Sequence, residues 1–352
     1  MKKIFWEEKA GCIIFYLVIL GLWMADFICP DRLYSDWEKR MLAQKPEASV
    51  STVSDGSYGQ AYETWLTDQF PLRDWWVSVK TRCELLLGKK EMSGVYLGKD
   101  GYLFSEQDQT ADWDLLEEQM KEQFKDETVS RICVPSAGEI LTDKTPQGIT
   151  FFQRNKGSDQ IYKALSEHKD EYIYYRTDHH WTMLGAYYAY EAWMKAQGCD
   201  PMPLAKMDRR VLKEDFFGTH YGRLHYAKYA DVMELYDPGI ACSAVYDLGK
   251  ADVSGLYQEK YLDTADAYRF FLDGNHGLVQ IESEGKGGHL AVLKDSFANC
   301  MIPFLTAHYG KITVIDPRYF RVDIGAWLKE QKPDQILILS QNTVYSSMCS
   351  SP

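Results

Sequence analysis

The longest run of apolar residues opens the chain and predicts a helix long enough to enter a membrane. Residues 10–25, AGCIIFYLVILGLWMA, contain no charged side chain and follow Lys2 and Lys3. A helix over this run is roughly 24 Å long, and a short extension brings it close to the ~30 Å hydrocarbon core of a bilayer. The lysine pair predicts residues 1–9 as a cytoplasmic tail and residues 10–29 as a transmembrane anchor, with the rest of the chain outside the cell.

Two other interpretations of this apolar run stay open. A buried core helix is one, although such a helix rarely opens a chain behind a pair of lysines. A cleaved signal peptide is the stronger rival. Because no clear Ala-x-Ala cleavage site follows the run, we favour a retained single-pass anchor in the cell membrane.

The pattern changes twice in the next part of the chain. Residues 30–57 are polar and interrupted by proline, serine and glycine, which predicts a stalk with a short helix at 35–43. Over residues 58–90 apolar side chains recur at helical spacing around Pro71, which predicts a lead-in of two helices that meet at the proline. Their aromatic face is expected to lie in a core, and it consists of Tyr62, Trp65, Phe70, Trp75 and Trp76.

Residues 91–352 alternate between short strand-like runs and helical segments, which is typical of a parallel α/β sheet with helices on both faces. An Asp-Gly turn between two apolar runs predicts a hairpin at 95–104, and a charged helix follows near 113–125. Further helices are predicted at 183–197 and 297–308. The predicted strands are 131–134, 172–175, 289–293, 311–315 and 335–339.

Composition limits the classes of function. Of 352 residues, 45% are apolar and 26% charged, so the chain has enough core-forming residues to fold. The net charge of -12 excludes a nucleic-acid binder driven by phosphate contacts, because the chain has no basic surplus. The eight cysteines are widely spaced without a Cys-x-x-Cys pair, which argues against a zinc ribbon or a thioredoxin-like site and leaves disulfide pairing open.

Two segments contain side chains that can act in catalysis. Each segment follows a predicted strand and precedes a predicted helix. One is residues 176–182, RTDHHWT, and the other is residues 293–297, LKDSF. Ligands bind at the carboxyl ends of strands in open α/β sheets. A serine needs an imidazole to accept its proton and a carboxylate to orient that imidazole. We therefore predict Ser296 as nucleophile, His180 as general base and Asp178 as its orienting group.

Simpler interpretations of the same residues remain. An Asp-Ser pair before a helix is often a helix cap. Asp178, His179 and His180 could also supply metal ligands, but adjacent residues in an extended chain point in opposite directions. No further ligand cluster accompanies them in the sequence. We therefore predict neither a metal nor a cofactor, and we expect Trp181 to be a packing anchor.

Five blocks of sequence, in order, resemble the DHHW proteins, which are relatives of the alginate O-acetylation proteins AlgX and AlgJ. The central block is the TDHHWT of residues 177–182. The others are GKDGYLF at 98–104, VPS at 134–136, KDSF at 294–297 and, after His308 and Tyr309, DPRYF at 316–320.

The resemblance implies an SGNH-hydrolase-like fold of permuted order, in which the Asp-x-His element precedes the serine block. It implies that Asp178 orients His180 and that Ser296 carries an acyl group, in an extracytoplasmic protein that takes acetyl from a membrane-bound O-acyltransferase and transfers it to an exported polysaccharide. His179, Asn299 and Arg318 are candidate substrate-binding residues, although an arginine after a strand, such as Arg318, is equally often part of a structural ion pair. Asn299 and Asn342 are also candidates for the oxyanion hole, for which no block is evident.

The main hypothesis is therefore a serine O-acetyltransferase for a cell-surface or exported polysaccharide, occupying residues 91–352. A non-catalytic protein that binds glycan or scaffolds the envelope is the rival from another class, and the apparently intact triad argues against it. A carbohydrate esterase is the third hypothesis. Lys294 stands where ordinary SGNH esterases have glycine, so hydrolytic activity stays open, and the outcome depends on how the site excludes water.

Overall fold

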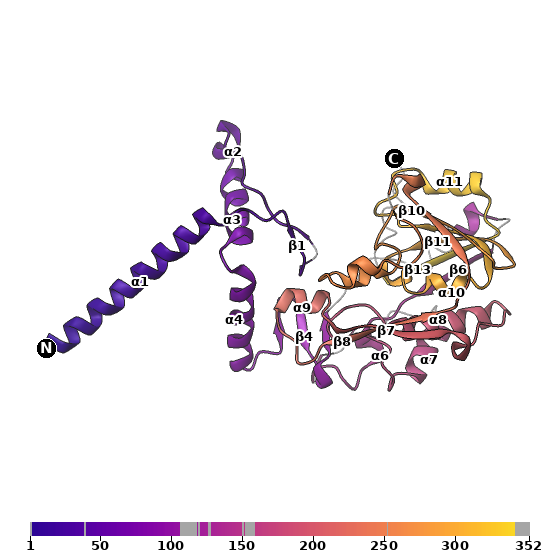
Figure 1. The fold of residues 1–352 in the computed structure, drawn as a ribbon, viewed down its shortest axis with the longest axis horizontal. Helices are drawn as coiled ribbons and strands as arrows, with labels where there is room; N and C mark the ends of the chain where they lie inside the picture. The colour runs from indigo at the N-terminus through magenta and orange to yellow at the C-terminus, as the bar shows by residue number, and fades with distance from the viewer. Residues whose placement is uncertain are drawn as a thin grey trace. The chain divides into compact units, whose positions relative to one another are not determined.

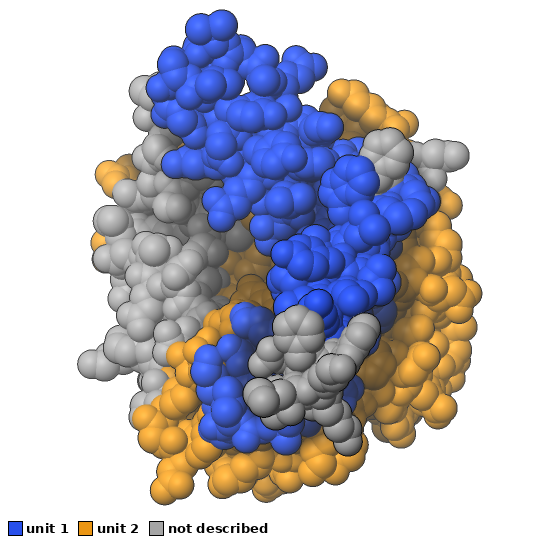
Figure 2. Space-filling view, turned by 90° about the vertical axis from the view of Figure 1, so that its left-hand side faces the viewer, with its two compact units in different colours: residues 1–89, 224–226 blue, residues 90–223, 227–352 orange. Residues whose placement is uncertain are grey.

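The computed structural model forms two compact units, coloured blue and orange in Figure 2. One comprises residues 1–89 and 224–226, and the other residues 90–223 and 227–352. The structure describes residues 2–38, 40–105, 118, 120–125, 128–149, 151, 159–251 and 253–341. Residues 113–117 and 119 of the predicted helix near 113–125, and the candidate Asn342, lie outside these residues.

The first helix, α1 (Lys2–Ile28), contains the apolar run that opens the chain (Figure 1). Its segment Lys9–Asp26 is long and apolar enough to cross a membrane, and none of it is buried within the protein. An apolar helix at this position is a signal sequence or an anchor.

The predicted short helix at 35–43 is wrong. Two short strands, β1 (Tyr34–Ser35) and β2 (Arg40–Met41), instead pair antiparallel. The buried carboxylate of Asp68 holds β2 in place, because it accepts hydrogen bonds from the Arg40 guanidinium at 2.6 and 2.8 Å and from the Ala43 backbone at 2.9 Å. Such charged contacts from a distant helix favour the extended conformation over a local helix.

A pair of helices on either side of Pro71 is confirmed. They are α3 (Ser57–Gln69) and α4 (Arg73–Leu86), preceded by the short α2 (Val50–Ser54). The proline ends α3 because it restricts the preceding Phe70 to an extended backbone, with φ -54° and ψ 131°.

The expectation that the aromatic face of this pair is all core is wrong. Trp65 is 8% exposed, but Trp75 is 54% and Trp76 is 39% exposed. Only part of the face is therefore covered.

The second unit opens with three antiparallel strands, β3 (Glu91–Met92), β4 (Val95–Leu97) and β5 (Leu103–Ser105). The β4–β5 pair confirms the predicted hairpin. Asp100 and Gly101 in its turn have φ values of 55° and 78°, the left-handed region that aspartate tolerates and glycine prefers.

A six-stranded, mostly parallel sheet forms the centre of this unit, in the order β6-β13-β11-β12-β10-β9. The first four strands run parallel, whereas β10 and β9 pair antiparallel. Four of the five predicted strands are confirmed, but residues 172–175 make only an isolated bridge between Tyr174 and Trp181. In sheet order the strands are Thr128–Cys133, Gln335–Ser340, Gly287–Lys294, Tyr309–Ile315, Leu278–Ser283 and Cys242–Tyr246.

Helices cover both faces of the sheet, because its strands are apolar on both sides. Leu337 and Leu339 pack in the core that includes α8 (Met183–Ala196), while Ile336 and Ile338 pack against α11 (Ile324–Gln331). The structure is therefore mixed α/β, as predicted. The predicted helix at 183–197 is also confirmed, since it corresponds to α8.

The predicted helix at 297–308 is shorter than expected. It consists of the 3₁₀ turn η6 (Ser296–Ala298) and α10 (Ile302–Leu305), with Pro303 early in α10. The described residues also form α6 (Ala137–Ile140), α7 (Asp159–Glu167), α9 (Thr219–Leu224) and an antiparallel pair, β7 (Asp208–Phe216) with β8 (Asp231–Asp237), besides short 3₁₀ turns.

Candidate active site

Residues 176–180 form the tip of a narrow hairpin. The backbone of Thr182 donates to the carbonyl of Ile173 at 2.9 Å, and that of Tyr175 donates to His180 at 3.3 Å. Trp181 is fully buried, as expected of a packing anchor, and its indole N–H donates to the carbonyl of Phe297 at 2.9 Å. The tryptophan therefore ties the histidine turn to the serine turn.

Ser296 begins the turn that follows the central strand β11. The carboxylate of Asp295 accepts from the backbone N–H of Phe297 at 2.9 Å and from that of Gln341, just past β13, at 2.7 Å. Asp295 is therefore the cap of this turn, which leaves Ser296 as the partly exposed residue beside it.

The two turns bring Asp178, His180 and Ser296 into hydrogen-bond contact. His180 Nε2 lies 2.8 Å from Ser296 Oγ, and His180 Nδ1 lies 2.5 Å from Asp178 Oδ1. An ionised carboxylate only accepts hydrogen bonds, so Nδ1 carries the ring proton and Nε2 is free to accept the serine proton. This is the arrangement of a Ser-His-Asp triad.

The second oxygen of Asp178 is held by Thr219, at the start of α9. The backbone N–H and the hydroxyl of Thr219 donate to Asp178 Oδ2 at 2.7 and 3.1 Å. Gly218 provides the space for this contact, because a Cβ atom there would lie 2.1 Å from that of Asp178. Neither Gly218 nor Thr219 was predicted as a site residue, and the available signal was the Gly-Thr pair at the start of a helix.

Aromatic rings enclose the imidazole of His180. Tyr268 stacks on it, and its hydroxyl lies 3.3 Å from the carbonyl of Ser296. The His179 ring centroid is 3.8 Å from that of His180, and the His179 side chain is 29% exposed. His220, also missed, is buried next to this pair, and burial lowers its pKa to about 4.

The metal hypothesis has a geometric basis, but the proton arrangement favours the triad. One ligand atom from each of Asp178, His179 and His180 lies within 4.8 Å of the others. The hydrogen bond between Asp178 and His180 already engages the carboxylate oxygen and the Nδ1 that a metal would need.

A buried network lies beneath the serine turn and contains the candidate Asn299. The ammonium of Lys294 is fully buried and donates at 2.9 Å to the side-chain oxygens of both Asn275 and Asn299. Asn299 donates in turn to the carbonyl of Gly274 at 3.0 Å and is 1% exposed. Its amide is therefore engaged with neighbouring protein groups in this structure.

The candidate Arg318 is an ion-pair partner within the same network. It donates to both oxygens of Asp316, at 2.9 and 2.7 Å. Asp316 also lies 3.3 Å from the Lys294 ammonium. These two cations hold the pKa of Asp316 below its usual range despite burial, so the carboxylate stays charged.

The segment that contains all three triad residues matches a known protein family. Residues 148–315 match the family model described as DHHW protein. Over these residues the chain matches the DHHW family. Its Asp178, His179, His180 and Trp181 spell the four letters of that description. A search of the curated proteins finds no match.

Solved structures share the fold of this protein. A DHHW family protein from Eubacterium siraeum DSM 15702 is 24% identical, with a TM-score of 0.61 over 73% of this chain and 93% of that chain. Bacillus cereus PatB1 with a sulfonyl adduct is 17% identical, with a TM-score of 0.56 over 70% and 94%. The O-acetyltransferase domain of Pseudomonas putida AlgJ is 13% identical, with a TM-score of 0.42 over 72% of this chain and 95% of that chain.

Proposed function

We propose that this protein is a membrane-anchored serine O-acetyltransferase that modifies a cell-surface or exported polysaccharide. The observation that carries the proposal is the unbroken chain of contacts from Asp178 through His180 to the partly exposed Ser296. The fold shared with PatB1 supports it, and so does the family match. In this proposal the SGNH-hydrolase-like unit lies outside the cell, behind the anchor formed by α1.

The reaction has two halves that use the same three side chains. In the first, His180 takes the Ser296 proton while Oγ attacks the acyl carbonyl of a donor, and the proton then passes to the donor's leaving group as its bond to the acyl carbon breaks. The products are acyl-Ser296 and the deacylated donor. A membrane-bound O-acyltransferase is the proposed source of the acyl group.

In the second half a sugar hydroxyl replaces the donor. His180 takes the hydroxyl proton as the sugar oxygen attacks the acyl-serine carbonyl, and returns the proton to Ser296 Oγ as the ester bond to the enzyme breaks. Asp178 stabilises the imidazolium that forms in each half. A water molecule in place of the sugar would make the same site an esterase, so exclusion of water from the acyl-serine decides between the two activities.

The test is acetyl transfer by the full-length chain in detergent. With p-nitrophenyl acetate as donor and pentagalacturonate or pentagalactose as acceptor, we expect acetylated oligosaccharide by mass spectrometry. Ser296→Ala is expected to abolish the product, whereas Ser254→Ala, which alters an exposed loop serine, is the matched control. Acetate release without acetylated sugar would favour the esterase, and neither product would favour the non-catalytic glycan binder.

A further inference from the structure

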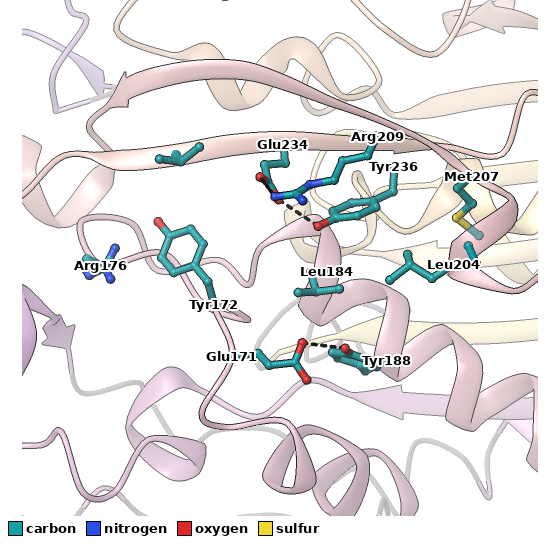
Figure 3. A pocket seen from close by; sticks show the side chains of 12 residues that line it. Glu171, Tyr172, Arg176, Leu184, Tyr188, Leu204, Met207, Arg209, Glu234 and Tyr236 are labelled. Atoms are coloured by element: carbon teal, nitrogen blue, oxygen red, sulfur yellow. Dashed lines mark hydrogen bonds and ion pairs between the residues drawn. The ribbon is translucent and has the colours of Figure 1, made fainter.

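A groove of about 920 Å³ runs beside the hairpin that bears Asp178 and His180. Figure 3 shows Arg176 and Tyr172 at one end of it and Met207 at the other. Tyr188 of α8 and Tyr236 of β8 line it between these ends. The walls thus combine aromatic rings with a few charged side chains, which is the composition of a site for a polar organic ligand.

One charge in the groove lacks a partner. The Arg176 guanidinium lies against the rings of Tyr102 and Tyr172, with its central carbon 5.3 and 4.8 Å from their centroids. Its Nε is buried without a hydrogen-bond partner, and among the described residues no carboxylate forms an ion pair with it. A partly exposed guanidinium held between two aromatic rings in this way is suited to bind a carboxylate.

The other charged side chains of the groove are held by hydrogen bonds within the protein. Glu234 accepts from Arg209 at 2.5 Å and from the Tyr236 hydroxyl at 2.9 Å. Glu171 accepts from the Tyr188 hydroxyl at 2.7 Å and lies 2.6 Å from the His168 ring. Arg209 thus neutralises Glu234, whereas Glu171 keeps its own charge, and Arg176 is the cation that has no carboxylate partner among the described residues of the groove.

The tyrosine rings of the groove are fixed in position. The Tyr172 hydroxyl donates to Asp231, and Tyr188 stacks on His168 with centroids 3.5 Å apart. Rings held by their hydroxyls present flat apolar faces at little entropic cost, which suits the C–H faces of sugar rings.

The Arg176 end of the groove is joined to the triad through Asp231. Besides the Tyr172 hydroxyl, this buried carboxylate accepts the backbone N–H groups of Arg176 at 2.6 Å and of Thr177 at 2.7 Å. Thr177 immediately precedes Asp178. A ligand carboxylate at Arg176 would therefore bind two residues before Asp178 of the triad.

We infer that this groove binds a carboxylated glycan, with a sugar carboxylate at Arg176 and sugar rings on the tyrosines. The inference rests on the proposed function for its biological meaning, since it identifies the acceptor. The chain's net charge of -12 disfavours general attraction of a polyanion, but the Arg176 guanidinium can still pair with one acidic group of the glycan.

Binding can be measured apart from catalysis. The full-length Ser296→Ala chain in detergent is titrated by calorimetry with pentagalacturonate and with pentagalactose, which differ in their carboxylates. We expect pentagalacturonate to bind at least about tenfold more tightly, the usual size of a charge-assisted contact. Arg176→Gln should remove this preference, Arg176→Lys should retain part of it, and Arg210→Gln, outside the groove, should leave it unchanged.

The outcomes separate the two proposals. Equal binding of both oligosaccharides by the parent, or an undiminished preference in a folded Arg176→Gln chain, would overturn the groove assignment even if acetyl transfer occurs. A preference that depends on Arg176 in a chain that transfers no acetyl group would support the groove and count against the acetyltransferase. Tyr188→Leu provides a second variant, and it should weaken binding of both oligosaccharides.

Discussion

The ring of Tyr268 stacks on the imidazole of His180, with centroids 4.0 Å apart and planes inclined by 11°. The tyrosine is 4% exposed, and its hydroxyl contacts the Ser296 carbonyl and Cys300 Sγ, each at 3.3 Å. One side chain therefore contacts both the general base and the turn that carries the nucleophile.

Removing this ring should loosen the triad. Tyr268→Ala is expected to lower the free energy of unfolding by about 3 to 5 kcal/mol, because it leaves a large cavity, and to slow acylation of Ser296 by p-nitrophenyl acetate. Tyr268→Phe keeps the stacked ring and should cost no more than about 1 kcal/mol. Urea denaturation and burst kinetics measure the two effects, and similar rates in the alanine and phenylalanine variants would show that stacking is unimportant.

Thr219 is expected to act as a positioning residue for Asp178. Thr219→Val removes one of the two donors to Asp178 Oδ2 and should slow acylation about fivefold, the equivalent of a ~1 kcal/mol hydrogen bond. Thr219→Ser keeps the hydroxyl and should restore the rate, which a purely structural role in packing the methyl group would not do. Equal rates in both variants would contradict this role.

Acid should destabilise the protein through His220. Burial lowers its pKa from 6.5 to about 4, so between these values a proton binds the unfolded chain but not the folded one. Neutral His220 therefore makes its full contribution to the free energy of unfolding above pH 6.5. This contribution, on the order of 3 kcal/mol, is lost as the pH falls towards 4. His220→Phe should flatten this part of the curve of unfolding free energy against pH, and parallel curves for variant and parent would refute the assignment.

The charges beneath the serine turn should respond unequally to substitution. Lys294→Met leaves Asp316 paired with Arg318, so we expect a modest loss of stability. Asp316→Asn removes the only carboxylate that pairs with Lys294 among the described residues and should cost about 3 to 5 kcal/mol. Urea denaturation of the two variants compares them, and an equal or larger loss in Lys294→Met would contradict this account of the network.

The sequence predicted those parts of the fold whose signal is periodic and local. The strands at 131–134 and 335–339 are nearly continuous apolar runs because both faces of the sheet are covered. Ser296 and His180 were predicted because each follows such a run at the edge where ligands bind. Strands of two residues, such as β1 and β2, are too short to show an alternation of apolar and polar side chains. Their position depends on contacts with Asp68, which is distant in the sequence.

The missed residues of the site belong to irregular segments far along the chain. Thr219 lies 41 residues after Asp178, and Tyr268 lies 28 residues before Ser296. Only the folded chain brings them to the triad, since neither segment has a pattern that marks it as part of a site. Arg176 was visible in the RTDHHWT segment, but its lack of a partner is a property of the tertiary structure.

The proposed reaction requires a covalent acyl intermediate on Ser296. The most direct measurement is peptide mass mapping of the full-length chain, quenched in acid after brief exposure to p-nitrophenyl acetate. We expect an acetyl group on Ser296 that disappears on addition of acceptor and is absent from His180→Ala. Acetylation confined to lysines or to other serines, or a Ser296 adduct that forms equally well in His180→Ala, would contradict it.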